Sequence, residues 1–139
     1  MRRLIFICLT VSLLLSALSC SLNDDGPNFH FKPLQITSAV LPDSFDLNET
    51  YQITVNYTLP DGCTGFSGFD VTAADTTIRN VVAFGIVRTD QEACITLATE
   101  AQASFNFICL YDEPYTFRFW QGEGVDGEQE YFEVLVPVY

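Results

Sequence analysis

The chain has 139 residues, of which 18 are acidic and six are basic, and its formal net charge is −12. A surface of this charge repels the phosphate backbone, which excludes nucleic-acid binding. With one histidine and no C-x-x-C pair a zinc site is poorly supported, and the length fits one folded domain.

The N-terminal residues have the layout of a secretory signal. Arg2 and Arg3 form a positive segment, and residues 4–18 carry no charge and are largely apolar. As a helix this run reaches about 22 Å, short of the roughly 30 Å hydrocarbon core of a bilayer. We therefore expect residues 1–19 to be a cleaved signal peptide, with an uncleaved anchor as the alternative.

The signal ends in Ala17-Leu18-Ser19-Cys20, which resembles the lipobox of bacterial lipoproteins. The resemblance implies that Cys20 receives a diacylglyceryl thioether and becomes the acylated first residue after cleavage. Ala17 departs from the more usual leucine. Each buried methylene contributes about 0.8 kcal/mol, so two or three acyl chains hold a protein at a membrane. The alternative is an ordinary secretory signal in which Cys20 is incidental.

Residues 20–30 are polar, acidic and rich in turn formers, so they read as a tether that cannot bury enough apolar surface to fold. The pair Asp24 and Asp25 resembles the export signal of Bacteroidota surface lipoproteins. That resemblance implies the outer face of the outer membrane; a periplasmic location and a plain spacer are the alternatives. Without residues 1–19, four basic residues stand against eighteen carboxylates, a formal charge of −14.

Alternation of apolar and polar residues predicts strands at 51–59, 115–119 and 132–138. The turn Pro60-Asp61-Gly62 ends the first of these strands. Pro137 has no amide donor, so the last strand is expected to lie at a sheet edge or to pair weakly at its end. Further strands are predicted at residues 34–41, 68–72, 78–88, 94–98 and 103–110.

The spacing of these segments predicts the fold class. Strands every 8 to 12 residues, with Pro, Gly, Asp and Asn between them, are typical of a sandwich. We expect residues 31–139 to form an all-β antiparallel β-sandwich of about eight strands, immunoglobulin-like or fibronectin-like, with a jelly roll as the alternative. No segment reads as an amphipathic helix, and the best, 99–103, is one turn long.

Of the five cysteines, Cys8 belongs to the signal and three follow Cys20. Cys63 and Cys94 each follow a turn or polar loop at a strand end, where a bridge can join two loops, so we predict a disulfide between them. Cys109 is in phase with neighbouring phenylalanines and is expected to be buried. The alternative is a Cys94–Cys109 bridge across a hairpin turning near residues 101–102.

The sequence contains no G-x-S-x-G, phosphate loop or H-E-x-x-H motif, so an enzyme is not expected. His30 is the only histidine and is interpreted as packed or solvated. In the loop from Glu123 to Glu130, Glu123, Asp126 and Glu128 could supply oxygens to calcium, but a charged hairpin tip is favoured.

Trp120 is the candidate ligand contact. It is out of phase with Tyr115, Phe117 and Phe119, and an indole pointing outward could stack on a sugar ring or a partner side chain. The alternative is that Trp120 caps the core or covers the opposite face of the sheet. Separately, Asp75-Thr76-Thr77 resembles the O-glycosylation acceptor of exported Bacteroidota proteins.

The whole chain resembles the small uncharacterised lipoproteins of Bacteroidota, which implies the cell envelope and no particular activity. We expect an exported, non-catalytic lipoprotein without a cofactor, bound to the bilayer through acylated Cys20. It would act as a binding or interaction module for a glycan or an envelope protein. The alternatives are a structural accessory subunit of an outer-membrane complex and, more distantly, a hydrolase that uses paired carboxylates.

Overall fold

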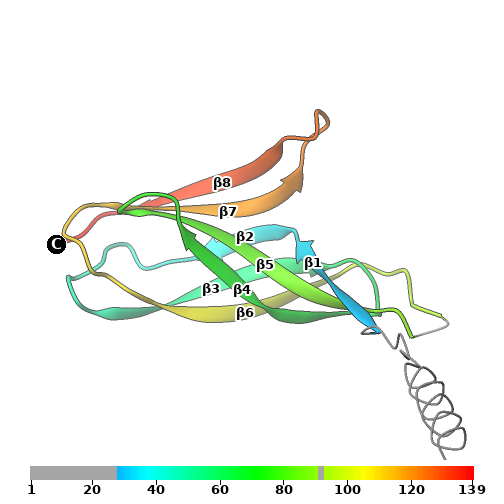
Figure 1. The fold of residues 1–139 in the computed structure, drawn as a ribbon. Coiled ribbons are helices and arrows are strands. Elements are labelled where there is room, and N and C mark those ends of the chain that lie inside the picture. The colour runs from blue at the N-terminus through cyan, green and yellow to red at the C-terminus, as the bar shows by residue number, and fades with distance from the viewer. Residues whose placement is uncertain (1–27, 91–92) are drawn as a thin grey trace, which may run out of the picture.

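The computed structural model describes residues 28–90 and 93–139, which form eight strands in two packed sheets (Figure 1). The predicted signal peptide, Cys20 and the tether up to residue 27 lie outside the described residues. The strands are β1 (Phe29–Leu34), β2 (Ile36–Val40), β3 (Thr50–Leu59), β4 (Thr64–Ala73), β5 (Ile78–Arg88), β6 (Thr99–Ile108), β7 (Tyr115–Glu123) and β8 (Gln129–Val136). Within the described residues, no helix is long and apolar enough to cross a bilayer.

The three-stranded sheet has the order β2-β3-β6, and both of its pairings are antiparallel. Its central strand β3 pairs with β6 along the full length of both, from Thr50 with Ile108 to Leu59 with Thr99. The period of two predicted for β3 is present, because Ile53, Val55 and Tyr57 are buried while the residues between them are not. One face of this sheet therefore packs on the core and the other faces solvent.

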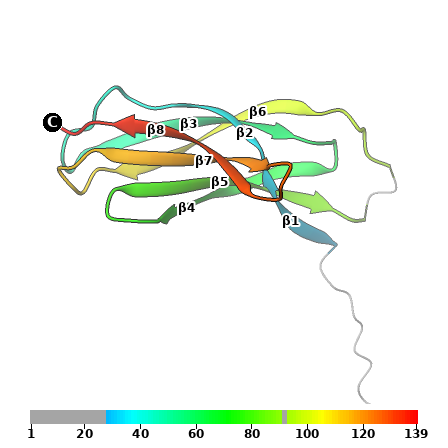
Figure 2. The same ribbon diagram turned by 90° about the horizontal axis from the view of Figure 1, so that it is seen from above.

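The five-stranded sheet is centred on β5. One edge of β5 carries β4, and the other carries β1 along residues 83–88 and β7 along residues 78–81. β8 completes the sheet beyond β7. The two sheets lie face to face in an elongated body (Figure 2). These features confirm the predicted all-β sandwich of about eight strands.

One pairing is not antiparallel, because β5 and β7 run in the same direction. The reason lies in the chain order. β5 leads to β6 in the other sheet, and β6 leads back to β7, so two reversals of direction restore the original one. An alternation pattern gives each strand its buried face but carries no information about its neighbour's direction.

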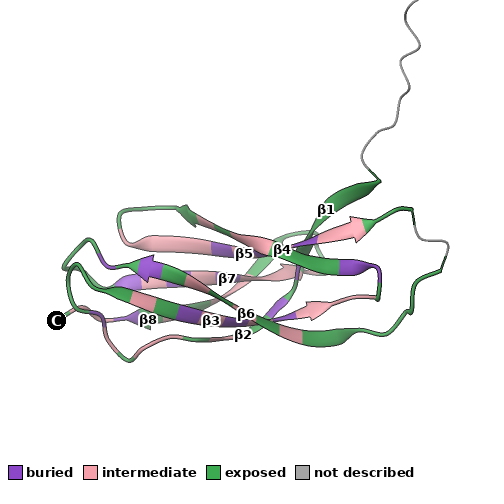
Figure 3. Cartoon of the chain, turned by 90° about the horizontal axis from the view of Figure 1, so that it is seen from below, coloured by how far each residue is buried: buried purple, intermediate pink, exposed green. Residues whose placement is uncertain are grey.

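The core fills the space between the sheets. Its largest fully buried side chains are Tyr115, Phe45, Phe117, Phe119, Leu34, Ile36 and Ile53, with Val55, Val81, Val136 and Cys109. Figure 3 shows the buried segments, in purple, distributed along strands of both sheets. Six aromatic side chains are thus buried in the core, and four partly buried ones pack against it.

Tyr115 secures the corner between β6 and β7. Its ring is fully buried, and its hydroxyl oxygen accepts hydrogen bonds from the amides of Leu110 and Tyr111, both at 3.1 Å. A tyrosine at the start of a strand that reaches back to the backbone a few residues upstream is typical of immunoglobulin-like sandwiches. The arrangement holds the chain where it crosses between the sheets.

Besides shifts of a few residues at strand ends, the elements differ from the predictions in three ways. The predicted strand 34–41 is two strands, because the chain bends at Gln35 and passes from one sheet to the other. β1 begins at Phe29, so residues 29 and 30, which the sequence assigned to the tether, belong to a sheet. Residues 94–98, predicted as a strand, form a loop, and β6 begins at Thr99, where a single helical turn was the best helix candidate.

The edge position of the last strand is confirmed, since β8 pairs with β7 alone. The residues after it return to the β2–β3 connection. The amide of Phe45 donates to the carbonyl of Pro137 at 2.9 Å, and the amide of Tyr139 donates to the carbonyl of Phe45 at 2.9 Å. The buried Phe45 ring is therefore fixed by the C-terminal residues.

Candidate functional site

Four segments meet at the end of the sandwich where the described chain begins. The strand registers place Phe29 opposite Arg88, Thr64 opposite Val87, and Leu59 opposite Thr99. The start of β1, the β3–β4 turn, the end of β5 and the 93–98 loop thus share this end, which we call the β1 end. The C-terminus lies at the opposite end of the sandwich (Figure 1).

The β3–β4 turn is held by Asp61. Its Oδ1 accepts a hydrogen bond from the Thr64 hydroxyl at 2.8 Å and one from the Cys63 amide at 2.9 Å. The hydrogen bond from the Thr64 hydroxyl is the main cause that holds the pKa of Asp61 below its ordinary value; the Cys63 and Thr64 amides and the charge of Lys32 act in the same direction. A carboxylate that accepts hydrogen bonds from its own turn makes that turn rigid.

A disulfide ties the 93–98 loop to this turn. Cys63 and Cys94 are bridged, with their Cα atoms 5.4 Å apart, which confirms the predicted pairing. Next to the bridge, the amide of Gly62 donates to the carbonyl of Ile95 at 2.9 Å. Cys109 is buried and is not in a disulfide, as predicted, and burial raises the pKa of its thiol.

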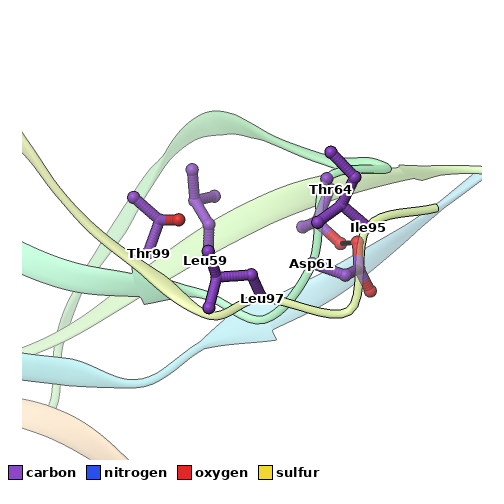
Figure 4. A pocket seen from close by; sticks show the side chains of 7 residues that line it. Leu59, Asp61, Thr64, Ile95, Leu97 and Thr99 are labelled. Carbon is purple, nitrogen blue, oxygen red and sulfur yellow. Dashed lines mark hydrogen bonds between the residues drawn. The ribbon is translucent and has the colours of Figure 1, made fainter.

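The 93–98 loop, held by this disulfide and hydrogen bond and called the pinned loop below, presents two large aliphatic side chains to solvent. Ile95 is 74% exposed and Leu97 is 67% exposed. They border a hollow of about 340 Å³ whose other lining residues are Leu59, Asp61, Gly62, Thr64 and Thr99. Figure 4 shows these side chains around the hollow, contributed by the end of β3, the turn, and the loop that precedes β6.

A second hollow, of about 370 Å³, borders the same turn. Its lining includes Gly65, Phe66, Ile86 and Arg88. Arg88 is held in place by Asp90, because its Nε and Nη2 donate to the two carboxylate oxygens at 3.0 and 2.7 Å. This pairing raises the pKa of Arg88 and lowers that of Asp90.

Trp120 lines a third and smaller hollow, of about 180 Å³, with Lys32, Pro33 and Pro60 among its neighbours. The indole is half-buried and lies on the face of β7 opposite the core-facing row, as its phase in the sequence predicts. Its Nε1 donates to Oε1 of Gln129 at 2.6 Å. The Trp120 side chain is therefore held by a hydrogen bond and lines a hollow. Its role as a ligand contact stays a prediction.

The acidic segment between β7 and β8 forms a hairpin tip. Glu123 accepts a hydrogen bond from the side chain of Gln129 at 2.9 Å, and the amide of Gly124 donates to the carbonyl of Glu128 at 2.8 Å. Gly127 has a φ of 78°, a left-handed conformation that glycine adopts readily. Within residues 28–90 and 93–139 no group of three or more His, Cys, Asp or Glu side chains is placed to hold a metal ion.

The remaining predicted residues do not line the two hollows beside the β3–β4 turn. His30 is exposed on β1, opposite Val87 of β5. Asp75, Thr76 and Thr77 form the β4–β5 turn at the far end of the sandwich, where the backbone carbonyls of Asp75 and Thr76 accept hydrogen bonds from Arg79.

Ile95 and Leu97 were not predicted from the sequence to be surface residues. Their alternation with Thr96 and Ala98 matches a half-buried strand, and an extended loop has the same pattern. The signal that could have separated the two is the neighbouring Cys94. A bridge from Cys94 to the β3–β4 turn fixes the loop at a strand end rather than inside a sheet.

Comparison with known proteins finds no match to a protein-family model, to a curated protein or to a solved structure.

Proposed function

We propose that this chain is an exported, non-catalytic lipoprotein that serves as an interaction module of the bacterial cell envelope. In this proposal Cys20 anchors it to the outer membrane and the sandwich is displayed at the cell surface. The observation that carries the binding role is the pair Ile95 and Leu97, which are exposed on a loop that a disulfide and a backbone hydrogen bond hold in place.

Exposure alone would not support binding, because apolar side chains are scattered singly over most protein surfaces. Here two large aliphatic residues lie two positions apart and border a hollow of about 340 Å³. A pinned loop loses little conformational entropy when it is covered by a partner, so more of the contact energy remains as affinity. Aliphatic side chains favour an apolar protein surface as the ligand.

The envelope location is supported by the sequence and by the disulfide. A signal-like segment followed by Cys20 and an acidic tether implies export and lipid attachment. A disulfide persists in an oxidising compartment such as the periplasm or the cell surface. The charge of −14 without the signal keeps such a domain soluble beside anionic lipid.

A second candidate function is that of a structural accessory subunit of an outer-membrane complex. It is favoured by Phe29 and Phe31, which are 41% and 60% exposed and pack edge to face with ring centroids 5.7 Å apart. They lie on β1, the first strand after the tether, where a permanent membrane partner would be within reach. For this role the loop carrying Ile95 would be dispensable.

Site-specific photocrosslinking in the native cell separates these functions. A photoreactive amino acid is placed at Ile95, at Phe31, or at Asp75 in the exposed turn at the far end. The interaction module predicts a discrete protein adduct from position 95 and none from position 75. An adduct from position 31 alone would identify the accessory subunit, and equal labelling from all three positions would overturn the proposal.

A further inference from the structure

The strand β6 is an open sheet edge of unusual regularity. It pairs with β3 on one side only, and its ten residues keep one register with β3 from end to end. It contains no proline, no glycine and no bulge, and Glu100 is its one charged residue. An edge of this kind presents a row of backbone donors and acceptors that can template another strand.

The other edges carry features that oppose strand addition. β4 has a register shift between Phe66 and Gly68. β2 is five residues long and is also irregular. β8 is followed by Pro137, which has no amide donor, and the remaining edge strand, β1, is six residues long and contains Pro33. Since bulges, short strands and proline all protect edges, β6 stands out as the unprotected one.

The inner side of the β6 edge offers an apolar surface. Phe105 of β6 meets Phe69 of β4 across the open side of the sandwich, with ring centroids 5.3 Å apart. Phe66 packs on Phe69 at 5.0 Å and stacks on Tyr57 at 4.8 Å, yet it is 37% exposed. Alternate side chains of an added strand could cover these rings, as neighbouring residues do within a sheet.

The outer side of the same edge offers hydrogen-bond acceptors. Asn56 donates to the Ser38 hydroxyl at 2.8 Å, and Gln102 donates to the Asn56 amide oxygen at 3.1 Å. This row crosses the sheet from β2 to β6 and ends at Gln102. Asn56, Glu100, Ala101 and Gln102 line a shallow hollow of about 220 Å³. A carboxylate and an amide oxygen at one hollow favour a side chain that donates, such as lysine.

We propose that β6 is a docking edge for an extended segment of a partner protein, which adds as a fourth strand to the three-stranded sheet. The segment has apolar residues toward Phe69 and Phe105, alternating with polar or basic residues toward Glu100 and Gln102. This inference rests on the proposed function as an interaction module and adds a second binding surface to the one at Ile95 and Leu97. Backbone pairing supplies affinity in such complexes, and the alternate side chains supply specificity.

Charge favours a foreign partner over a second copy of this chain. Each copy carries a formal net charge of −12, or −14 without the signal, so two copies repel one another. The outward residues of β6 include no cation that could offset the carboxylate of Glu100. A basic segment gains from the same field that opposes self-pairing.

The test uses the full chain purified in detergent and fluorescent peptides of about ten residues, the length of β6. The first peptide alternates valine with threonine and lysine, and a scrambled peptide of equal composition is its control. Two further peptides carry backbone N-methyl groups on one or the other alternate set of residues. In an added strand only one set of amides pairs with the edge, while the other faces solvent.

We expect the alternating peptide to bind and the scrambled peptide to bind at least about tenfold more weakly. Methylation of one set should weaken binding at least about tenfold, and methylation of the other should leave it nearly unchanged. Peptide binding should also slow amide hydrogen exchange in residues 99–108. Glu100→Lys should weaken binding of the lysine-bearing peptide several-fold. Glu128→Lys, which changes the net charge by the same amount at the hairpin tip, should leave that binding unchanged.

Three results would overturn the docking edge. The first is that the alternating peptide does not bind at millimolar concentration. The second is that both N-methylated peptides lose affinity equally. The third is that peptide binding slows amide hydrogen exchange outside β6 and not within it. If the peptide-free chain already shows protection at residues 99–108 that is lost on dilution, the occupant is a second copy. The proposed function fails separately, through the loss of the adduct at position 95.

Discussion

Several side chains in this sandwich are fixed by more than apolar burial, and Tyr115 shows this most directly. Its hydroxyl oxygen is the acceptor for two consecutive amides, those of Leu110 and Tyr111. Tyr115→Phe keeps the buried ring and removes only that acceptor. We expect the free energy of unfolding to fall by about 1 to 3 kcal/mol, because both donors lose their partner.

Chemical denaturation measures this change, and Tyr111→Phe is the matched control. Tyr111 is 44% exposed, so loss of its hydroxyl should alter stability by less than about 0.5 kcal/mol. Equal stability of the Tyr115→Phe variant and the parent protein would show that the corner is held by packing alone.

Gly85 marks a close approach between strands. A Cβ atom there would lie 2.9 Å from Cγ2 of Thr64 and 3.0 Å from Cδ2 of Leu34. Gly85→Ala should therefore destabilise the fold by about 1 to 3 kcal/mol, since the neighbours belong to packed strands and have little room to move. Gly65→Ala is the control, because a Cβ there has no neighbour within 4 Å. Thermal unfolding of the two variants should diverge, and identical melting temperatures would contradict the close contact.

The lowered pKa of Asp61 should make the free energy of unfolding depend on pH. The Thr64 hydroxyl and the turn amides lower its pKa in the folded state, so its carboxylate binds fewer protons there than in the unfolded chain. Its stabilising effect is therefore present above the ordinary aspartate pKa of about 3.9 and is lost as the pH falls through the lower, folded value.

The comparison that isolates this effect is the unfolding free energy of the parent protein minus that of Asp61→Asn. This difference should be constant from neutral pH to about pH 5 and should then shrink toward acid. Titrations of the other carboxylates act on both proteins and cancel. A difference that grows on acidification would reverse the sign of the proposed linkage.

At the scale of elements, the disulfide decides how the 93–98 loop behaves. The cysteines are separated by 31 positions, and closing such a loop stabilises by about 3.7 kcal/mol on the chain-entropy model. Replacing both Cys63 and Cys94 with alanine should lower the unfolding free energy by about 2 to 5 kcal/mol. The double variant should also lose the crosslinked adduct at Ile95 before it loses the fold. Full stability without the bridge would mean that the β3–β4 turn fixes the loop unaided.

Strands could be predicted from the sequence where one face of the strand is buried and the other is exposed to solvent. β3 and β7 alternate in burial residue by residue, and their phases follow from the sequence. The loop at 94–98 was not predictable in this way, because its alternation reflects exposed Ile95 and Leu97 rather than a buried face. The bend at Gln35 was not predicted either. Leu34 and Ile36 are both buried and so fit a single alternating strand, but they belong to different sheets.

Of the candidate site, only the disulfide between Cys63 and Cys94 could be predicted from the sequence. Cys63 and Cys94 could be paired because each lies beside a turn, which places two thiols at the surface ends of strands. The hollows around that turn depend on which strands become neighbours. Pro33 and Trp120, for example, line the same hollow although they are distant in the sequence. Periodicity within one strand contains no information about such contacts.

At the scale of the whole molecule, the β1 end combines the exit toward the tether with the exposed residues Phe29, Phe31, Ile95 and Leu97. A lipid attached at Cys20 would hold this end near the membrane and direct the far end outward. Partners of the pinned loop would then approach beside the bilayer rather than at the tip of the domain.

The proposed lipid anchor on Cys20 is tested by mass spectrometry of the protein isolated from bacterial membranes. The predicted result is a chain that begins at Cys20, lacks residues 1–19 and carries a diacylglyceryl group with an additional acyl chain on the first residue. A chain that retains residues 1–19, or whose Cys20 carries no lipid, would show that the protein is not anchored in this way.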